Sequence, residues 1–460
     1  MFKINAFTIL LIFLLSSGLF AQNDDGWQDL LNGSDLTGWN QKGGKAEYFV
    51  EDDMIVGQST LNTPNSFLCT DEDFSDFILE FDVFDDTELN SGVQIRSNSL
   101  ADYMDGRVHG YQVEIDPSPR AFSGGIYDEA RRGWLYPLSR NEHGRTAFHN
   151  GEWNHYRVEA IGNTLRTWIN GIMCANLVDD MTSKGFIGLQ VHQISDSNLD
   201  GTQVRWRNIR IKTNSLESEQ YEIDPQVPEL SYLVNKLTRM EKRKGWRLLF
   251  DGKTGNGWRG AKLDHFPEKG WNIKDGILTI QGTDGGESTG PGDIITEDQF
   301  SNFDLELEFM ISEGANSGIK YFVDPELNKS TGSAIGCEYQ LLDDQKHPDA
   351  KEGISGNRTL ASLYDLIPAE GLTIAGRPKQ FNGTGSWNKA RIFSMDGYVE
   401  HWLNNEKVVE YDRFSQMFRA LVAGSKYAKW EGFGQWSQGH ILLQDHGYTV
   451  HFRSIKIREF

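Results

Sequence analysis

The sequence predicts an all-β protein made of two tandem jelly-roll-like sandwiches joined by a short, partly helical linker. Three observations lead to this prediction. Blocks of sequence recur in the same order in both halves of the chain, short runs alternate between apolar and polar residues, and long helical periodicity is scarce. Alternation with a period of two, interrupted by Gly, Asn and Asp, is typical of antiparallel sandwiches.

The internal repeat sets the expected domains. Matched pairs of blocks begin at Trp27 and Trp246, Phe74 and Phe300, Asn90 and Asn316, Trp153 and Trp387, and Gly185 and Gly439. We therefore expect domains at residues 26–212 and 245–460, with a linker at 213–244. Within this linker, Glu229–Lys244 reads as a short amphipathic helix that serves as a solvated spacer or packs the two domains together.

The first 21 residues resemble a secretory signal peptide. Lys3 precedes an apolar run from about Phe7 to Leu15, and small residues follow before Ala21. We expect cleavage after Ala21 and export to the periplasm or the extracellular space. A retained anchor is the alternative, because Leu19 stands where a small residue is usual. The apolar run is shorter than the ~20 residues of a membrane-spanning helix, so we expect no membrane partner after cleavage.

Charge and cysteine content exclude several classes of function. A net charge of −21 disfavours binding to nucleic acid or to an anionic membrane surface, since both reward basic patches. The cysteines, Cys69, Cys174 and Cys337, show no metal-type spacing. Cys69 and Cys174 could form a disulfide in an oxidising compartment.

Several predicted strands carry polar residues on one face. In Cys337-Glu338-Tyr339-Gln340-Leu341, Glu338 and Gln340 share a face because side chains two apart project together. The first copy offers Gln112, Glu114 and Asp116 in the same way. Solvent-exposed strand faces are the simple alternative, but acids, amides, His and cations together suit a polyol-binding groove. The further polar positions on such faces are Gln94 with Arg96, Lys320, Gln190 with His192, and Gln444 with His446.

A second polar cluster lies on loops, where binding residues are common. It includes Tyr127, Asp128, Arg131 and Trp134 in the first copy, and Arg358, Tyr364 and Asp365 in the second. An Arg–Asp network that only fixes a long loop is an equally weighted alternative. Asp343, Asp344, His347 and Asp349 could hold a divalent cation, but we predict no cofactor and leave the metal unknown.

The second copy resembles the 3-keto-disaccharide hydrolase family over residues 245–460. The resemblance rests on Asn316-Ser317-Gly318-Ile319-Lys320-Tyr321, Glu338–Asp344, Asn357-Arg358-Thr359, Ser362–Asp365, His401-Trp402-Leu403-Asn404 and Leu443-Gln444-Asp445-His446-Gly447. The first copy is similar through His109–Asp116 and Gly124–Asp128, but it carries Thr167 where the second has His401, and Arg96 opposite Phe322. The resemblance implies a concanavalin-like jelly roll.

The resemblance also implies cleavage of glycosides whose sugar carries a 3-ketone. The ketone acidifies the C2 proton, so a base can remove it while an oxyanion develops. The C1 substituent then leaves, giving a 2-hydroxy-glucal, and addition of water completes net hydrolysis. This lyase–hydratase route needs a base, an acid for the leaving oxygen and a donor for the enolate.

We assign roles within this scheme as hypotheses. In the second copy, His446 or Glu338 is the base, Lys320 stabilises the enolate, and Tyr364 or His401 donates the proton. The counterparts in the first copy are His192 or Glu114, Arg96 and Tyr127. A histidine suits proton abstraction near neutral pH better than an exposed glutamate. The expected substrate-binding residues are Gln340, Gln444, Arg358, Asp365, Asn316, Gln112, Gln190, Asp128, Arg131 and Trp134.

Two other functions remain open from the sequence. The chain could bind carbohydrate without cleaving it, since jelly rolls include lectins as well as enzymes. An endo-glucanase is the lower alternative, because such an enzyme would want several acids at alternate positions of one strand. The second copy offers only Glu338 with Gln340 on such a strand, and the first copy offers only Glu114 with Asp116.

Overall fold

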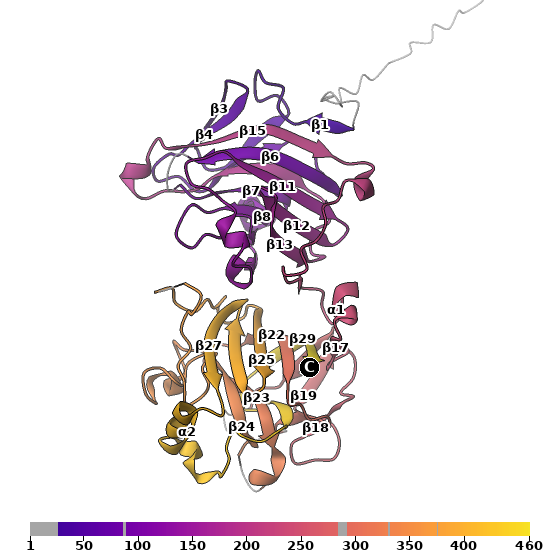
Figure 1. The fold of residues 1–460 in the computed structure, drawn as a ribbon, viewed down its shortest axis with the longest axis vertical. Coiled ribbons are helices and arrows are strands. Elements are labelled where there is room, and N and C mark those ends of the chain that lie inside the picture. Colours follow the sequence, from indigo (N-terminus) through magenta and orange to yellow (C-terminus); the bar gives the residue numbers. More distant parts are fainter. Residues whose placement is uncertain (1–25, 86–88, 284–291, 330–331, 375) are drawn as a thin grey trace, which may run out of the picture.

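The computed structural model describes residues 26–85, 89–283, 292–329, 332–374 and 376–460, so the predicted signal peptide lies outside the described residues. Figure 1 shows two β-rich domains, one above the other along the long axis. Each domain has two mainly antiparallel sheets, and the expected all-β class is confirmed. Among the described residues, none of the helices is long and apolar enough to cross a membrane.

The first domain contains sheets of unequal size. The larger runs in the order β16 (Leu230–Ser231), β13 (Ile172–Val178), β12 (Thr164–Ile169), β11 (Asn154–Ile161), β6 (Phe77–Asp85), β15 (Gln203–Lys212), β4 (Met54–Gln58) and β3 (Glu47–Glu51), with β1 (Trp27–Asp29) also paired to β15. The smaller runs β10 (Gly133–Tyr136), β9 (Ile126–Glu129), β8 (His109–Ile115), β7 (Ser91–Asn98), β14 (Phe186–Val191), β5 (Ser66–Thr70) and β2 (Trp39–Gly43).

The second domain repeats this arrangement. Its larger sheet runs β19 (Trp271–Lys274), β20 (Ile277–Ile280), β29 (Val450–Glu459), β22 (Phe303–Ile311), β25 (Asn388–Met395), β26 (Tyr398–Leu403) and β27 (Glu406–Asp412), with β17 (Arg247–Leu248) paired to β29. Its smaller sheet runs β18 (Trp258–Gly260), β21 (Ile294–Thr296), β28 (His440–Leu443), β23 (Asn316–Asp324) and β24 (Ile335–Leu342). Among the described residues, the α-helices are α1 (Arg239–Arg243) in the linker and α2 (Gln416–Ala423) in the second domain.

Short 3₁₀ turns connect many of these strands. They lie at Met104–Gly106, Leu138–Arg140, Gly144–Thr146, Ser197–Leu199, Leu216–Ser218, Pro325–Leu327, Pro348–Lys351 and Lys426–Lys429.

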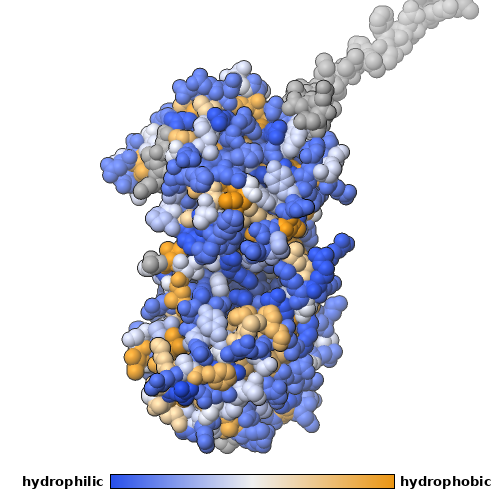
Figure 2. All heavy atoms as spheres, in the orientation of Figure 1, coloured by the Kyte–Doolittle hydropathy of each residue, from blue (hydrophilic) through white to orange (hydrophobic). Residues whose placement is uncertain are grey.

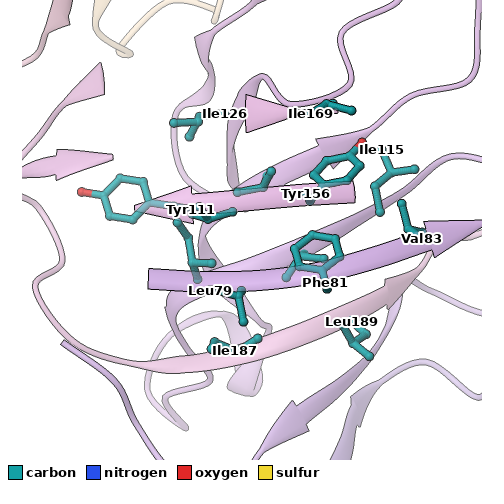
Figure 3. Close-up of a cluster of buried hydrophobic side chains, with 14 of the residues drawn as sticks. Leu79, Phe81, Val83, Tyr111, Ile115, Ile126, Tyr156, Ile169, Ile187 and Leu189 are labelled. Carbon is teal, nitrogen blue, oxygen red and sulfur yellow. The ribbon is translucent and has the colours of Figure 1, made fainter. Parts of the chain in front are cut away.

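Alternation along the strands places one face in the core of each sandwich. Tyr111, Val113 and Ile115 of β8 are fully buried between the sheets of the first domain. Figure 3 shows this core, where the rings of Phe81 and Tyr156 stack with their centres 4.9 Å apart. Burying side chains of this size contributes about 1.5–3 kcal/mol each to stability. The opposite face of the smaller sheet is therefore free to carry polar residues.

The duplication extends to irregularities of the backbone. Asn208 on β15 and Ser454 on β29 both have a positive φ, and the register of each strand shifts at that point. Arg96 on β7 and Phe322 on β23 form a second matched pair of bulges. Because a bulge adds a residue to one strand, it reverses the face that the following side chains occupy.

The linker is not a solvated helix, because part of it pairs with the first domain. Leu230 and Ser231 form β16, which pairs in parallel with β13 at the edge of the first domain's larger sheet. Helix α1 spans only Arg239–Arg243 and begins at a capping box between Thr238 and Glu241. The helix expected over Glu229–Lys244 is confirmed only at Arg239–Arg243. It is wrong for the residues before them, because Leu230 is buried against the sheet and the backbone reaches positive φ at Asn235.

The two domains contact each other directly. The Ser139 hydroxyl donates to the backbone oxygen of Asn405 at 2.6 Å. The Asn405 amide donates to the backbone oxygen of Leu135 at 3.3 Å and to the Tyr232 hydroxyl at 3.0 Å.

The molecular surface seen in Figure 2 is mainly hydrophilic. Hydrophobic side chains gather mostly over the second domain.

Candidate functional site

A cleft of about 910 Å³ lies on the polar face of the first domain's smaller sheet. Strands β5, β8, β9, β10 and β14 contribute to its lining, together with the loop that follows β8. Seven of the polar or aromatic residues named from the sequence line it: Gln112, Glu114, Asp116, Tyr127, Trp134, Gln190 and His192. Other charged or amide side chains in the lining are Asn65, Asn90, Arg107, Arg120, Glu129 and Gln193.

Glycine on β7 makes room for the polar side chains of β8. A Cβ atom added to Gly92 would lie 2.6 Å from the Gln112 side chain, closer than real contacts allow. A Cβ atom on Gly318 of β23 would lie 2.4 Å from a carboxylate oxygen of Glu338. The Asn-Ser-Gly segment of each copy therefore provides the space in which the acid and amide pack.

Glu114 sits at the centre of a hydrogen-bond network. Its carboxylate accepts from the Asn90 amide at 2.7 Å and from the Gln112 amide at 3.1 Å. Gln112 in turn accepts from the Gln94 amide at 2.6 Å. Only 4% of Glu114 is exposed. Burial raises the pKa of its carboxyl to about 7, although the hydrogen bond from Asn90, the charge of Arg120 and the bond from Gln112 act in the opposite direction.

Other cleft residues are placed to bind and orient a ligand. Within the described part of the chain, the amide nitrogen and oxygen of Gln190 have no hydrogen-bond partner, although this side chain is buried at the cleft. Trp134 packs edge-to-face against Tyr127, with ring centres 5.3 Å apart. Burial raises the pKa of Tyr127, so its hydroxyl keeps its proton. The His192 ring is half-buried and lies 2.7 Å from the backbone oxygen of Gln193.

Arg120 is a cleft residue that the sequence analysis missed. Its guanidinium donates to Asp116 at 2.7 Å, lies 3.6 Å from Glu114 and covers the Trp134 ring at 5.0 Å. The sequence places Asn90 in a repeated block but does not mark it as a site residue. Its match with Asn316, a proposed binding residue, was the available signal; Arg120 lies on an irregular loop and gives no periodic signal.

The second domain carries a related but different polar face. Lys320 on β23 lies 3.7 Å from Glu338 on β24 and donates to the Ser333 hydroxyl at 2.5 Å. The Gln340 amide lies 3.3 Å from an oxygen of Asn316 and 3.3 Å from one of Glu338. The structure therefore brings Asn316, Lys320, Glu338 and Gln340 together, as the sequence predicted.

Comparisons with known proteins agree with the duplicated fold. Residues 26–212 and 245–458 each match the family described as the 3-keto-alpha-glucoside-1,2-lyase-like domain. The chain belongs to this family. A 3-keto-disaccharide hydrolase from Bacteroides thetaiotaomicron is 40% identical over 234 residues, which are 46% of this chain and 78% of that protein.

Solved structures similar to the chain include a protein from Parabacteroides distasonis named "putative glycosyl hydrolase". It is 32% identical, covers 49% of this chain and 99% of its own, and has a TM-score of 0.43. A carbohydrate-binding module, CBM66 from Bacillus subtilis, is 19% identical, covers 38% of this chain and 97% of its own, and has a TM-score of 0.26.

The loop residues of the second lyase-like domain form an ion-pair network. Arg358 donates to Asp365 at 2.8 Å and to Asp349 at 3.0 Å. The Tyr364 hydroxyl donates to Asp349 at 2.8 Å. Burial raises the pKa of Tyr364, and the charge of Glu338 raises it further. Tyr364 is thus close to the Glu338 face, while Arg358 and Asp365 hold the loop that carries it.

Gln444 and His446 follow β28 at one end of the second domain's smaller sheet. The backbone N–H of Gln444 donates to Gly318 at 3.0 Å, next to the Asn-Ser-Gly segment. The His446 ring lies beside Tyr448, with ring centres 6.4 Å apart. In the part of the chain that the structure describes, the buried Nδ1 of His446 has no hydrogen-bond partner.

Arg96 does not lie in the cleft of the first lyase-like domain. Alternation with Gln94 predicted a shared face, but the bulge at Arg96 has a φ of 46° and turns the side chain away. The guanidinium donates to the backbone oxygens of Ser75, Ala160 and Gly162, and it pairs with Asp76 at 2.9 Å. Arg96 therefore ties chain segments together and is not placed to stabilise an enolate.

His401 is also outside the candidate site. It lies on β26 of the larger sheet, fully buried between the sheets. Its ring nitrogens lie 2.7 Å from the Tyr321 hydroxyl and 3.0 Å from the backbone oxygen of Ala361. Burial lowers its pKa to about 4, so at neutral pH the ring is uncharged and is not the imidazolium that an acid catalyst would need.

Asp128 and Arg131 form the loop network that the sequence left as an alternative. The buried Asp128 carboxylate accepts from Arg131 at 2.7 Å and from Arg132 at 2.5 Å. Arg132 also pairs with Asp179 at the end of β13. These contacts fix the turn between β9 and β10 and so support Tyr127 and Trp134, whereas the Asp128 and Arg131 side chains do not line the cleft.

The cysteines and the acidic loop give two further results. Cys69, Cys174 and Cys337 are all buried free thiols, so the disulfide between Cys69 and Cys174 is not formed.

Among the described residues, no group of three or more His, Cys, Asp and Glu side chains is arranged to hold a metal ion. Asp343 accepts from backbone N–H groups, and Asp344 pairs with Lys379 at 2.8 Å.

Proposed function

We propose that the protein is an exported carbohydrate-active enzyme that cleaves 3-keto-glycosides. The buried Glu114, with a pKa of about 7 at the floor of a polar cleft, is the observation that carries this proposal. Membership of the 3-keto-alpha-glucoside-1,2-lyase-like family supports the substrate class, as does the relative named 3-keto-disaccharide hydrolase. Perturbed acids in clefts are characteristic of catalytic sites.

Glu114 is the base that removes the C2 proton of the 3-keto sugar. A carboxylate whose pKa lies near the operating pH combines an available basic form with a strong driving force for proton transfer. Asn90 and Gln112 hold the carboxylate in one orientation. This assignment reverses the preference for His192 that the sequence suggested, because the structure buries Glu114 instead of exposing it.

The remaining cleft residues fit the other steps of the elimination. Negative charge develops on the C3 oxygen, and the Arg120 guanidinium and the Gln190 amide are the nearby donors. Tyr127 or His192 protonates the leaving C1 oxygen, and the products are the free alcohol and a 3-keto-2-hydroxy-glucal. Water added across the double bond then gives the 3-keto sugar, so atoms balance as a hydrolysis.

The second domain provides a second site with a different charge pattern. Glu338 takes the role of the base there, with Lys320 beside it as the cation for the developing oxyanion and Tyr364 as the proton donor.

The proposed export rests on the predicted signal peptide, Met1–Ala21. An intact mass of the secreted protein that corresponds to a start at Gln22 is the test of export, and a retained leader would contradict it.

Turnover of a 3-keto-glucoside or 3-keto-trehalose by the purified mature chain tests the activity, with products followed by mass spectrometry with and without chelator. We expect the glucal and the 3-keto sugar, and we expect Glu114→Gln and Glu338→Gln each to remove the contribution of one domain. Glu51→Gln, an exposed change in the first domain, is the matched control. Sugar binding without product would instead establish a carbohydrate-binding protein, and reducing ends released from plain β-glucan would establish an endo-glucanase.

A further inference from the structure

A segment of the second domain reaches the rim of the first domain's cleft. Ile374 packs against the hydrophobic core of the first domain. The Arg377 guanidinium lies 5.3 Å from the centre of the Phe122 ring. Arg377 also pairs with Glu406 at 3.0 Å, at the start of β27. An element of one domain therefore contacts the loop that carries cleft residues of the other.

Two guanidinium groups contact the Phe122 ring. Arg120 of the cleft covers the Phe122 ring at 5.5 Å, and Arg377 covers it at 5.3 Å. Phe122 also packs edge-to-face on Trp134, with ring centres 5.1 Å apart. A cation held over an aromatic ring is attracted by the negative face of the ring, so Arg377 adds to the forces that fix Phe122 and the loop around it.

The charges on this rim depend on one another. Arg120 and Arg377 carry like charges. Burial lowers the pKa of the Arg377 guanidinium, and the charge of Arg120 lowers it further. Glu406 is buried at 3% exposure and interacts electrostatically with Arg377 and with Arg120. Because Glu406 neutralises the charge of Arg377, Arg377 repels Arg120 less. The Arg120 guanidinium keeps its contacts with Asp116 and Glu114.

We propose that Arg377 of the second domain is a positioning residue for the first domain's cleft, acting through Phe122 to hold Arg120 beside Glu114. The catalytic consequence rests on the proposed function of the cleft. The contacts of Ser139 with Asn405 and of Asn405 with Leu135 fix the same two domains to each other. The second copy is thus both a site of its own and a support for the first.

Hydrogen–deuterium exchange of the full chain tests the positioning without any need for activity. In Arg377→Met, which keeps the aliphatic stem and removes the charge, we expect peptides that cover residues 117–124 to exchange at least about threefold faster than in the wild type. Arg377→Lys should restore part of the protection. Peptides from β3 and β4, far along the other sheet, should be unchanged, and so should all peptides in the control Glu410→Gln. Identical exchange in Arg377→Met and the wild type would overturn the proposal.

The pH dependence of kcat/KM for a 3-keto-glucoside, measured with Glu338→Gln in every protein so that the first domain alone reacts, provides the second measurement. Because the Arg120 charge favours the ionised form of Glu114, its displacement in Arg377→Met should move the acidic midpoint to a higher pH. A lower kcat with an unmoved midpoint would show loss of structure only and would count against the positioning role. Glu114→Gln is measured in parallel. Full turnover by that variant would remove the proposed base, while the exchange result would still decide whether Arg377 positions the loop.

Discussion

Glu338 in the second domain stands where Gln112 stands in the first. Gln112 is paired in register with Gln94 on β7, and Glu338 is paired in the same way with Lys320 on β23. The acid of the first domain, Glu114, lies two residues further along its strand. Successive residues rise about 3.3 Å along a strand, so the two carboxylates are displaced by about 7 Å relative to the shared fold.

This displacement changes the surroundings of the acid. Glu114 is held by the amides of Asn90 and Gln112, with the Arg120 guanidinium of a loop 3.6 Å away, and burial is the largest influence on its pKa. Glu338 lies 3.7 Å from an ammonium group. The duplicated domains therefore keep an acid and an amide on one face but offer different charge patterns, which favours different substrates or different steps at the two sites.

The pH profile of the first domain's reaction should reflect Glu114. Since the base must be ionised, kcat/KM should fall as the pH drops through about 7, and Glu114→Gln should lower kcat by about 10²- to 10⁴-fold. Asn90→Leu removes a donor that favours the ionised carboxylate, so the midpoint should move to a higher pH. The measurement is made in Glu338→Gln, so that the first domain alone reacts.

Asn40→Leu is the control for this experiment, because the Asn40 amide bonds to Asp71 in an exposed contact. Its profile should match that of the parent. A midpoint near pH 4.5 in the parent, or a midpoint that Asn90→Leu leaves in place, would contradict the role of Glu114.

Stability should record the cost of burying Glu114. In the unfolded chain this carboxyl ionises near its ordinary pKa of 4.5, whereas in the folded protein it does so at about 7. The folded state therefore loses stability as the pH rises from 4.5 to 7, and the loss is complete above that range. Glu114→Gln should match the wild type near pH 4 and exceed it by roughly 3 kcal/mol at pH 8.

Thermal or denaturant unfolding of both proteins at the two pH values measures this difference. Glu51→Gln, which changes an exposed carboxyl, should show no such dependence. An equal effect of Glu114→Gln at pH 4 and pH 8 would mean that the side chain is not held as a buried acid.

The regular parts of the fold were predictable from the sequence, and the cleft face of β8 is the clearest case. Strict alternation places Tyr111, Val113 and Ile115 in the core and leaves Gln112 and Glu114 on the other face. Periodicity gives the face of a residue but not its burial. Glu114 was therefore expected to behave as an exposed glutamate, whereas tertiary packing covers it.

Irregular backbone and the packing of the two sheets account for what the sequence did not predict. Arg96 follows the alternation of Gln94 in the sequence, yet a bulge at that residue directs it elsewhere. Arg120 lies on a loop whose path depends on contacts with Phe122 and, across the domain boundary, Arg377. His401 belongs to a motif of the family, and only the packing of two sheets shows that it is a core residue.

Replacing His401 should affect folding and not turnover. His401→Ala leaves the Tyr321 hydroxyl and the Ala361 carbonyl short of a buried partner and opens a cavity, at a cost of about 2–4 kcal/mol. Because burial lowers the His401 pKa to about 4, the wild type should itself lose stability as the pH falls from 6.5 towards 4, where only the unfolded chain takes up the proton.

This acid-dependent loss should be smaller in His401→Ala, as measured by unfolding at pH 7 and pH 5. The folded fraction of the variant should retain the kcat of the wild type at pH 7. A large fall in kcat with unchanged stability would return His401 to the list of catalytic residues.

The thiols should be unreactive in the folded protein. Burial raises the pKa of Cys69, Cys174 and Cys337 to about 12 in each case, and the thiolate is the reactive form. A thiol reagent at pH 8 should therefore modify none of them in the native state and all of them after denaturation without reductant. The two cysteines of the first domain, Cys69 and Cys174, lie on β5 and β13 in opposite sheets. Modification of Cys337 alone under denaturing conditions would mean that Cys69 and Cys174 form a disulfide. This part of the fold would then differ from the structure.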